Sequence, residues 1–137
     1  MAHILRIPLG IANAYLVREG DASILIDAGA PRQGGKFFTT LAKHGMDPSR
    51  IALIVVTHVH YDHVGNLRDI RDACRCPVAV PAGEASWLRE GAMVFPAGTH
   101  RLGRVMIALS RFGARILPAA VRYAPVEADL PIEDELD

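Results

Sequence analysis

Short apolar runs separated by glycine-rich or charged turns mark the first ninety positions of this 137-residue chain. The runs at 4–9, 14–17 and 23–26 predict three strands, and a Gly20-Asp21 pair between the last two is typical of a hairpin turn. The continuous branched run IALIVV at 51–56 predicts a strand that is buried on both faces. Residues 77–82, PVAVPA, predict one more short strand.

Helical spacing follows in the segments between these runs. We expect helices at 36–45, 66–73 and 83–90, the first ended by Gly45 in the position after its C-cap. Their predicted apolar faces are Phe37, Phe38 and Leu41, then Leu67, Ile70 and Ala73, then Trp87 and Leu88. Beyond residue 91 the pattern weakens: 104–117 suggests a helix interrupted by Gly113, 119–123 a strand, and the last residues an acidic tail. The alternation of strands and helices predicts an α/β fold with helices packed on a sheet.

Composition narrows the class of protein further. Half of the residues are hydrophobic and 22% are charged, which is typical of a globular domain, and we take 1–137 as one domain. Net charge is zero, so we expect neither nucleic acid nor a membrane as partner. The N-terminus lacks the pattern of a signal peptide, and the two cysteines are too few for a disulfide framework, so a cytoplasmic location is expected.

The charges are nevertheless unevenly distributed. Residues 89–122 contain six arginines and one acid, and the residues after 126 contain six acids and no base. We interpret these segments as two solvated surfaces that pair with each other. Residues 104–117, RVMIALSRFGARIL, leave three alternatives open: an ordinary packed helix or dimer contact, the lining of a substrate entrance, or a basic amphipathic helix on a membrane surface.

The largest group of candidate functional residues lies directly after the run at 51–56, in the segment THVHYDHVGN. It holds His58, His60, Asp62 and His63, three of the six histidines of the chain. His58 and His60 are two positions apart, so in extended backbone they point the same way and both reach one ion. Imidazole and carboxylate ligands suit zinc, and also iron or manganese. The alternative, an Asp62 helix cap with histidines exposed by accident, explains the composition less well.

At these residues the sequence resembles the metallo-β-lactamase fold superfamily of metal-dependent hydrolases. THVHYDHVGN is similar to its His-x-His-x-Asp-His signature, residues 13–30 to its opening hairpin with an Asp-x-Gly turn at Asp27, and residues 76–88 to the strand and helix after the signature. The resemblance implies half of an αβ/βα sandwich, a mixed sheet with helices on one face. It covers roughly residues 10 to 90.

The resemblance also implies roles for the clustered residues. His58 and His60 would hold a first zinc ion, and Asp62 and His63 a second. Asp27 would lie behind them and order their loop by hydrogen bonds. Asp62 would also serve in catalysis, by orienting the attacking water or taking its proton. The implied reaction is attack by metal-bound hydroxide on a small ester, thioester, lactone or related substrate.

The chain departs from the family pattern after His63. A third histidine in a later Gly-His-Thr-x-Gly-like turn, a bridging aspartate and a final histidine have no counterpart, and His100 in PAGTHRLG does not match. We therefore expect an incomplete domain, with 91–137 as the region between the two halves plus an acidic tail. Half a sandwich leaves one sheet face apolar and open, so we expect a homodimer or pairing with a missing C-terminal half.

These departures leave two alternatives to the hydrolase: a non-catalytic half-domain that dimerises and binds metal weakly or not at all, and an iron-dependent oxygenase or redox branch. Cys74 and Cys76 are interpreted as small packed residues rather than metal ligands. His3 and His44 have no partner nearby in sequence and are expected at the surface, and His100 is expected in a loop.

Overall fold

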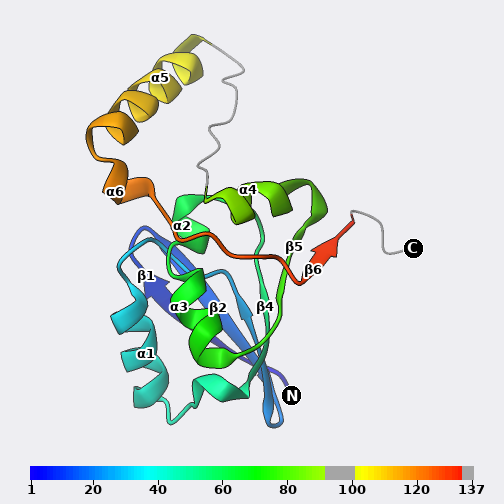
Figure 1. The fold of residues 1–137 in the computed structure, drawn as a ribbon. Helices are drawn as coiled ribbons and strands as arrows, with labels where there is room; N and C mark the ends of the chain where they lie inside the picture. The colour runs from blue at the N-terminus through cyan, green and yellow to red at the C-terminus, as the bar shows by residue number, and fades with distance from the viewer. Residues whose placement is uncertain (92–100, 134–137) are drawn as a thin grey trace.

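The computed structural model describes residues 1–91 and 101–133 (Figure 1). Its strands form one six-stranded mixed sheet in sequence order, antiparallel from β1 to β3 and parallel from β3 to β6. The strands are β1 (His3–Leu9), β2 (Ala12–Glu19), β3 (Ala22–Ile26), β4 (Ile51–Val55), β5 (Val78–Pro81) and β6 (Leu130–Ile132). Gly20, with φ 60°, sits in the predicted hairpin turn between β2 and β3.

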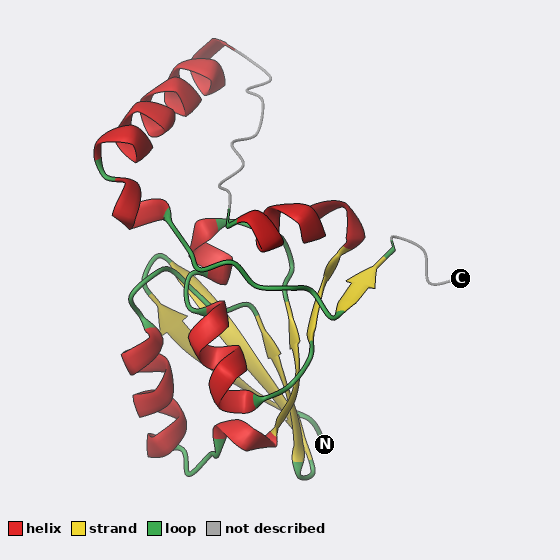
Figure 2. Cartoon of the chain, viewed as in Figure 1, coloured by secondary structure: helices red, strands yellow, loops and turns green. Residues whose placement is uncertain are grey.

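Helices connect the parallel strands, as crossover connections require. They are α1 (Gly34–Lys43), α2 (Tyr61–Val64), α3 (Leu67–Cys74), α4 (Ala85–Glu90), α5 (Arg101–Ile116) and α6 (Pro118–Val121), with 3₁₀ turns η1 (Pro48–Arg50) and η2 (Ala82–Glu84). Figure 2 shows α1 and α3 side by side against one face of the sheet. The predicted α/β half-sandwich is therefore confirmed.

The core lies between this sheet face and the helices. Phe37 and Leu41 of α1 are fully buried against sheet residues such as Leu25 and Ile54. On α3 the apolar face is Leu67, Ile70 and Cys74; Ala73, which we placed on that face, is exposed. Gly45 adopts φ 63° just after α1, as the sequence predicted.

The opposite sheet face is apolar and open. Register places Tyr15 beside Ile26, Ile24 beside Leu53, and Ile26 beside Val55 on that face. Tyr15 and Ile24 are 38% and 40% exposed, and Leu53 and Val55 are half-buried. The expectation that residues 51–56 are buried on both faces is wrong, because α1 and α3 pack on the other face (Figure 2); the expected open apolar face is confirmed.

Several predictions beyond residue 91 are wrong. The strand expected at 119–123 is wrong: Pro118 opens α6, since its fixed φ suits the first turn of a helix. Gly113 does not interrupt α5, which continues to Ile116. Strand β6 was not predicted from the sequence. Its start is fixed by Asp129, whose N–H donates to the Val78 carbonyl and whose carboxylate accepts from the Val78 N–H, both at 2.9 Å. Residues 134–137 of the expected acidic tail lie outside the described residues.

Candidate functional site

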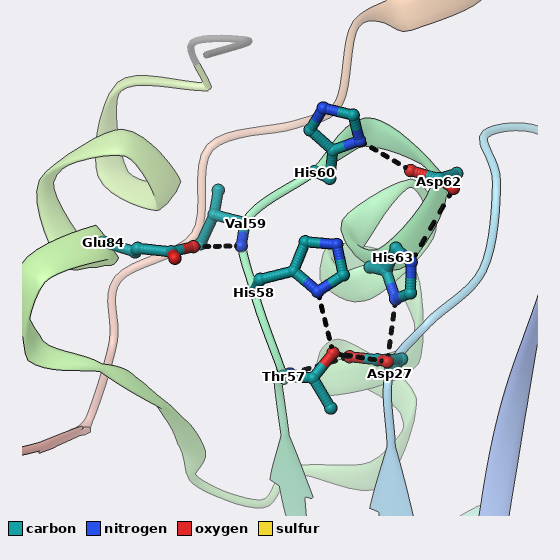
Figure 3. A network of polar contacts seen from close by, with 8 residues as sticks. All are labelled: Asp27, Thr57, His58, Val59, His60, Asp62, His63 and Glu84. Atoms are coloured by element: carbon teal, nitrogen blue, oxygen red, sulfur yellow. Dashed lines mark hydrogen bonds and ion pairs between the residues drawn. The ribbon is translucent and has the colours of Figure 1, made fainter. Parts of the chain in front are cut away.

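The four clustered residues occupy the loop after β4 and the short helix that follows it. His58 and His60 lie in the loop, with His60 extended at φ −128° as the residue before α2. Asp62 and His63 lie in α2 itself (Figure 3). This is the carboxyl edge of the parallel strands, where open α/β sheets bind ligands. The three histidines and Asp62 are partly exposed, so solvent reaches them.

The side chains of these residues are close neighbours. The ring centroids of His58 and His63 are 4.0 Å apart, and those of His58 and His60 are 5.9 Å apart. Asp62 lies between two of the rings, with Oδ1 at 3.0 Å from Nδ1 of His60 and Oδ2 at 3.7 Å from Nε2 of His63. The fold thus brings all four residues to one place.

Asp27 connects this cluster to the end of β3. Its carboxylate accepts hydrogen bonds from the backbone N–H of Thr57 at 2.8 Å and from the Thr57 hydroxyl at 2.8 Å, and its Oδ2 lies 2.8 Å from Nδ1 of His63. The residue is 5% exposed and has φ 61°, which is uncommon for a residue with a side chain. Backbone strain of this kind persists where surrounding contacts hold it, often at functional sites.

These contacts define which histidine nitrogens carry protons. The Thr57 hydroxyl donates its hydrogen to Asp27, so its oxygen accepts from Nδ1 of His58, 3.1 Å away. A carboxylate acceptor at Nδ1 of His63 likewise places a proton on that nitrogen. With these tautomers the lone pairs of His58 and His63 lie on Nε2, as in histidines that bind a metal through one nitrogen while a hydrogen bond holds the other; Nε2 of His63 faces Oδ2 of Asp62 at 3.7 Å.

One further residue, which was not predicted from the sequence, binds the loop from the opposite side. Glu84, at the end of η2, accepts a hydrogen bond from the backbone N–H of Val59, which lies between His58 and His60 (Figure 3). Val59 is buried at 3% exposure, so its N–H depends on this partner. An available signal was its position: Glu84 follows β5 at the same edge of the sheet where the histidines follow β4.

The loop after β3 and the start of α3 are also tied together. The buried Asn66 amide donates to the carbonyls of Ala28 and Ala30 at 2.7 Å each, and its Oδ1 accepts from the Gln33 N–H at 2.9 Å. The backbone of Gly65 passes so close that a Cβ there would lie 2.3 Å from the nitrogen of Pro31. Gly65 therefore packs directly against the backbone of the loop after β3.

The remaining candidate residues lie apart from the cluster. Cys74 and Cys76 are buried, and burial raises both pKa values, that of Cys74 to about 12, so these thiols stay protonated and packed. His3 and His44 are exposed, His3 on β1 and His44 after α1. His100 lies outside the described residues.

The donor set of the cluster fits zinc in chemistry, since it offers imidazole nitrogens and a carboxylate. Within residues 1–91 and 101–133, however, no group of three or more His, Cys, Asp or Glu side chains is arranged to hold a metal ion. Asp62 is instead engaged with His60, and His63 with Asp27. The assignment of His58, His60, Asp62 and His63 as ligands stays a prediction.

Comparison with known proteins places this arrangement in a class. The model of the metallo-beta-lactamase superfamily matches residues 7–137. Probable metallo-hydrolase YqgX of Bacillus subtilis is 32% identical over 90 residues, covering 64% of this chain and 40% of the relative. Probable metallo-hydrolase YflN of the same organism is 25% identical over 131 residues, covering 91% of this chain and 50% of the relative.

Solved structures agree on the fold. A subclass B3 metallo-beta-lactamase of Bradyrhizobium japonicum has a TM-score of 0.71 at 19% identity, covering 96% of this chain and 43% of that one. The fold is thus that of about half of a metallo-beta-lactamase sandwich. The chain belongs to the metallo-beta-lactamase superfamily, and it spans half or less of the length of the two curated relatives described above.

Proposed function

We propose that this chain carries the histidine-rich part of a metal-dependent hydrolase centre that acts on a small ester, thioester, lactone or related substrate. The observation that carries the proposal is the chain of contacts from Asp27 to His63 and, through Thr57, to His58. These contacts hold both rings by Nδ1, so that Nε2 is the nitrogen of each ring that could bind a metal ion.

The proposed roles follow from the contacts. His58 and His60 would hold one zinc ion, and Asp62 and His63 would contribute to a second; iron or manganese would be held by the same donors. Bound zinc would lower the pKa of a water ligand to about 7 and polarise the electrophilic oxygen of the substrate. Asp62, partly exposed beside His60, would orient that water or accept its proton. Asp27 and Glu84 would keep the loop in place.

Metal content tests this proposal directly. We expect the purified chain to retain zinc in elemental analysis after dialysis, and the double variant His58→Ala with His60→Ala to lose it. The matched control is His3→Ala with His44→Ala, which removes two exposed histidines elsewhere. Equal zinc content in the two double variants would refute the site assignment. Hydrolysis of a panel of esters, thioesters and lactones by the zinc-loaded chain then tests the reaction class.

A second candidate is a half-domain that pairs through its open sheet face and binds metal weakly or not at all. Two observations favour it: the apolar face of Tyr15, Ile24, Leu53 and Val55, and the lack of a three-ligand group within the described residues. We propose a homodimer, or pairing with a C-terminal half. Light scattering should give a mass above the monomer, and Ile24→Lys with Leu53→Lys should restore the monomer. A monomeric unsubstituted chain at micromolar concentration would contradict pairing with itself.

A further inference from the structure

Helix α5 presents a row of apolar side chains to solvent. Val105, Leu109, Phe112 and Ile116 follow one another at spacings of four, three and four residues, which places them on one side of a helix. Their exposures are 56%, 65%, 63% and 60%. Figure 1 shows α5 standing away from the sheet and from α1 and α3, so this row does not contribute to the core.

Arginines run beside this row. Arg104, Arg111 and Arg115 each precede a member of the apolar row by one position, about 100° around the helix axis. The segment 101–122 contains five arginines and no aspartate or glutamate. Although the whole chain is neutral, this helix is strongly basic, and its basic side borders its apolar side.

We propose that α5 binds the surface of an anionic lipid bilayer, lying in the plane of the interface. Helices with one apolar side and a cationic polar side bind in this way, with the apolar side chains at the boundary of headgroups and acyl chains. The arginines reach the lipid phosphates while their aliphatic stems cover apolar surface. None of the helices in the described ranges has the length and apolar character needed to cross a bilayer, so the contact is with the surface.

Charge complementarity favours this occupant, because five arginines and no acid lie in the segment that carries the apolar row. A protein partner for α5 would have to offer several carboxylates beside an apolar groove. In the acidic C-terminal segment, Asp129 binds Arg71 at 2.9 Å and the N–H of Val78, so among the described residues a second copy has the exposed Glu127 and Glu133 to offer, and the solution mass below tests that contact. Anionic lipid offers negative charge and an apolar layer together. The expectation from net charge that no membrane is contacted stays a prediction, against which this proposal for α5 is to be tested, and the inference does not depend on the metal centre.

Vesicle sedimentation tests the proposal on the whole 137-residue chain. Vesicles of phosphatidylcholine and phosphatidylglycerol in equal amounts are compared with vesicles of phosphatidylcholine alone. We expect the chain to sediment with the mixed vesicles and to remain in solution with the neutral ones. Binding should weaken as salt is raised from about 0.1 M to about 1 M, because the Debye length falls from about 10 to about 3 Å.

Two double variants separate the contributions of charge and apolar surface. Arg104→Gln with Arg115→Gln should weaken binding about 30-fold, since each arginine near an anionic surface contributes roughly a fivefold factor. Leu109→Ser with Phe112→Ser should abolish it. The matched controls lie elsewhere in the chain: Arg18→Gln with Arg50→Gln, and Ile4→Ser with Ile11→Ser. Both should bind as the unsubstituted chain does. All eight substituted side chains are exposed, so folding should be preserved, as circular dichroism can check.

Several results would overturn the assignment: equal binding to neutral and anionic vesicles, no binding to either, or equal losses in the variants and their controls. A fall in solution mass for the Leu109→Ser, Phe112→Ser variant without any vesicle binding would assign the face to a protein contact instead. As an independent measurement, Phe112→Trp in a Trp87→Phe background should show a blue-shifted emission with mixed vesicles. An unchanged spectrum would contradict insertion of this face.

Discussion

Oδ2 of Asp27 lies 2.8 Å from Nδ1 of His63, thirty-six positions further along the chain. The same carboxylate accepts hydrogen bonds from the backbone N–H and the hydroxyl of Thr57. The hydroxyl oxygen of Thr57 in turn lies 3.1 Å from Nδ1 of His58. One buried acid at the end of β3 therefore sets the orientation of two histidines that belong to the next βα connection.

Replacement of Asp27 by asparagine tests this arrangement. Asparagine tolerates the positive φ at this position and can still accept the Thr57 N–H through its oxygen. Its amide NH₂ cannot accept a hydrogen bond from Nδ1 of His63, so that ring should turn or change tautomer and lose the lone pair on Nε2. We expect zinc affinity to fall about 10- to 100-fold, as for other carboxylates behind metal-binding histidines, with the circular dichroism spectrum preserved.

Competition with a chromophoric chelator would measure that affinity. Asp21→Asn, in the exposed hairpin turn, is the charge-matched control and should bind zinc like the unsubstituted chain. Equal affinity in Asp27→Asn and Asp21→Asn would show that the carboxylate of Asp27 has no role in metal binding.

Glu84 should matter for stability through the N–H of Val59. Glu84→Ala leaves that buried donor without its partner, which costs about 1–3 kcal/mol. Glu84→Gln keeps an acceptor and should lose less, because a neutral hydrogen bond is weaker than one to a carboxylate. Urea unfolding should be measured for both variants and for a control, Glu90→Ala, on the exposed side of α4. The loss of stability should be largest for Glu84→Ala, smaller for Glu84→Gln and smallest for the control. Equal midpoints for Glu84→Ala and Glu90→Ala would contradict the role.

The secondary structure of much of the first ninety residues, and the position of the site, were predictable because the local sequence signals there agree with the tertiary structure. The hairpin turn at Gly20, the helix end at Gly45 and the position of His58 after a buried strand each follow from short-range rules. The apolar run at 51–56 was harder to interpret. Its pattern does not distinguish two buried faces from one buried and one open, and here Leu53 and Val55 are only half-buried.

What the sequence did not reveal depends on contacts between distant segments. Glu84 joins the site through a backbone N–H twenty-five positions away; its place after β5 indicates the right edge of the sheet, but no local pattern identifies the Val59 N–H as its partner. The strand β6 consists of three exposed residues of which the middle one is a proline, so its apolar pattern is minimal; Asp129 fixes it by bonding to Val78. The helix α6 was missed because Val121 and Tyr123 favour a strand, whereas the structure follows the helix preference of Ala119 and Ala120 after Pro118.

Gly65 should tolerate no side chain. A Cβ there would lie 2.3 Å from the Pro31 nitrogen and 2.5 Å from the Ala30 carbonyl carbon, both backbone atoms that cannot move without separating the two loops. We expect Gly65→Ala to lose about 3 kcal/mol or more of unfolding free energy, together with zinc binding. Gly35→Ala is the control, because nothing lies within 4 Å of a Cβ at that position. It should gain up to about 1 kcal/mol, since alanine favours helix over glycine.

The same urea titrations decide the outcome for Gly65. Similar midpoints for the two alanine variants would mean that the loops separate without loss of stability. Loss of zinc binding in Gly65→Ala with an unchanged midpoint would show instead that the close approach serves the site and not the fold.

The buried thiols and Tyr123 should make the protein sensitive to alkali. Burial raises the pKa of Cys74 from 9.0 to about 12 and that of Tyr123 from 10.0 to about 12, and the Tyr123 hydroxyl donates to the Trp87 carbonyl. The unfolded chain therefore releases these protons at lower pH than the folded one. Their contribution to stability is fully present below about pH 9 and is lost as pH rises towards 12.

Two measurements check this prediction. The urea midpoint should fall steadily between about pH 9 and about pH 12, and Cys74→Ala with Tyr123→Phe should flatten that fall although it lowers the midpoint at pH 7. At pH 8 iodoacetamide should leave both cysteines of the folded chain unmodified and react with both in urea, because the thiolate is the reactive species. Rapid alkylation of the folded chain at pH 8 would mean that Cys74 or Cys76 is accessible as a thiolate, and the packed role assigned to both would be wrong.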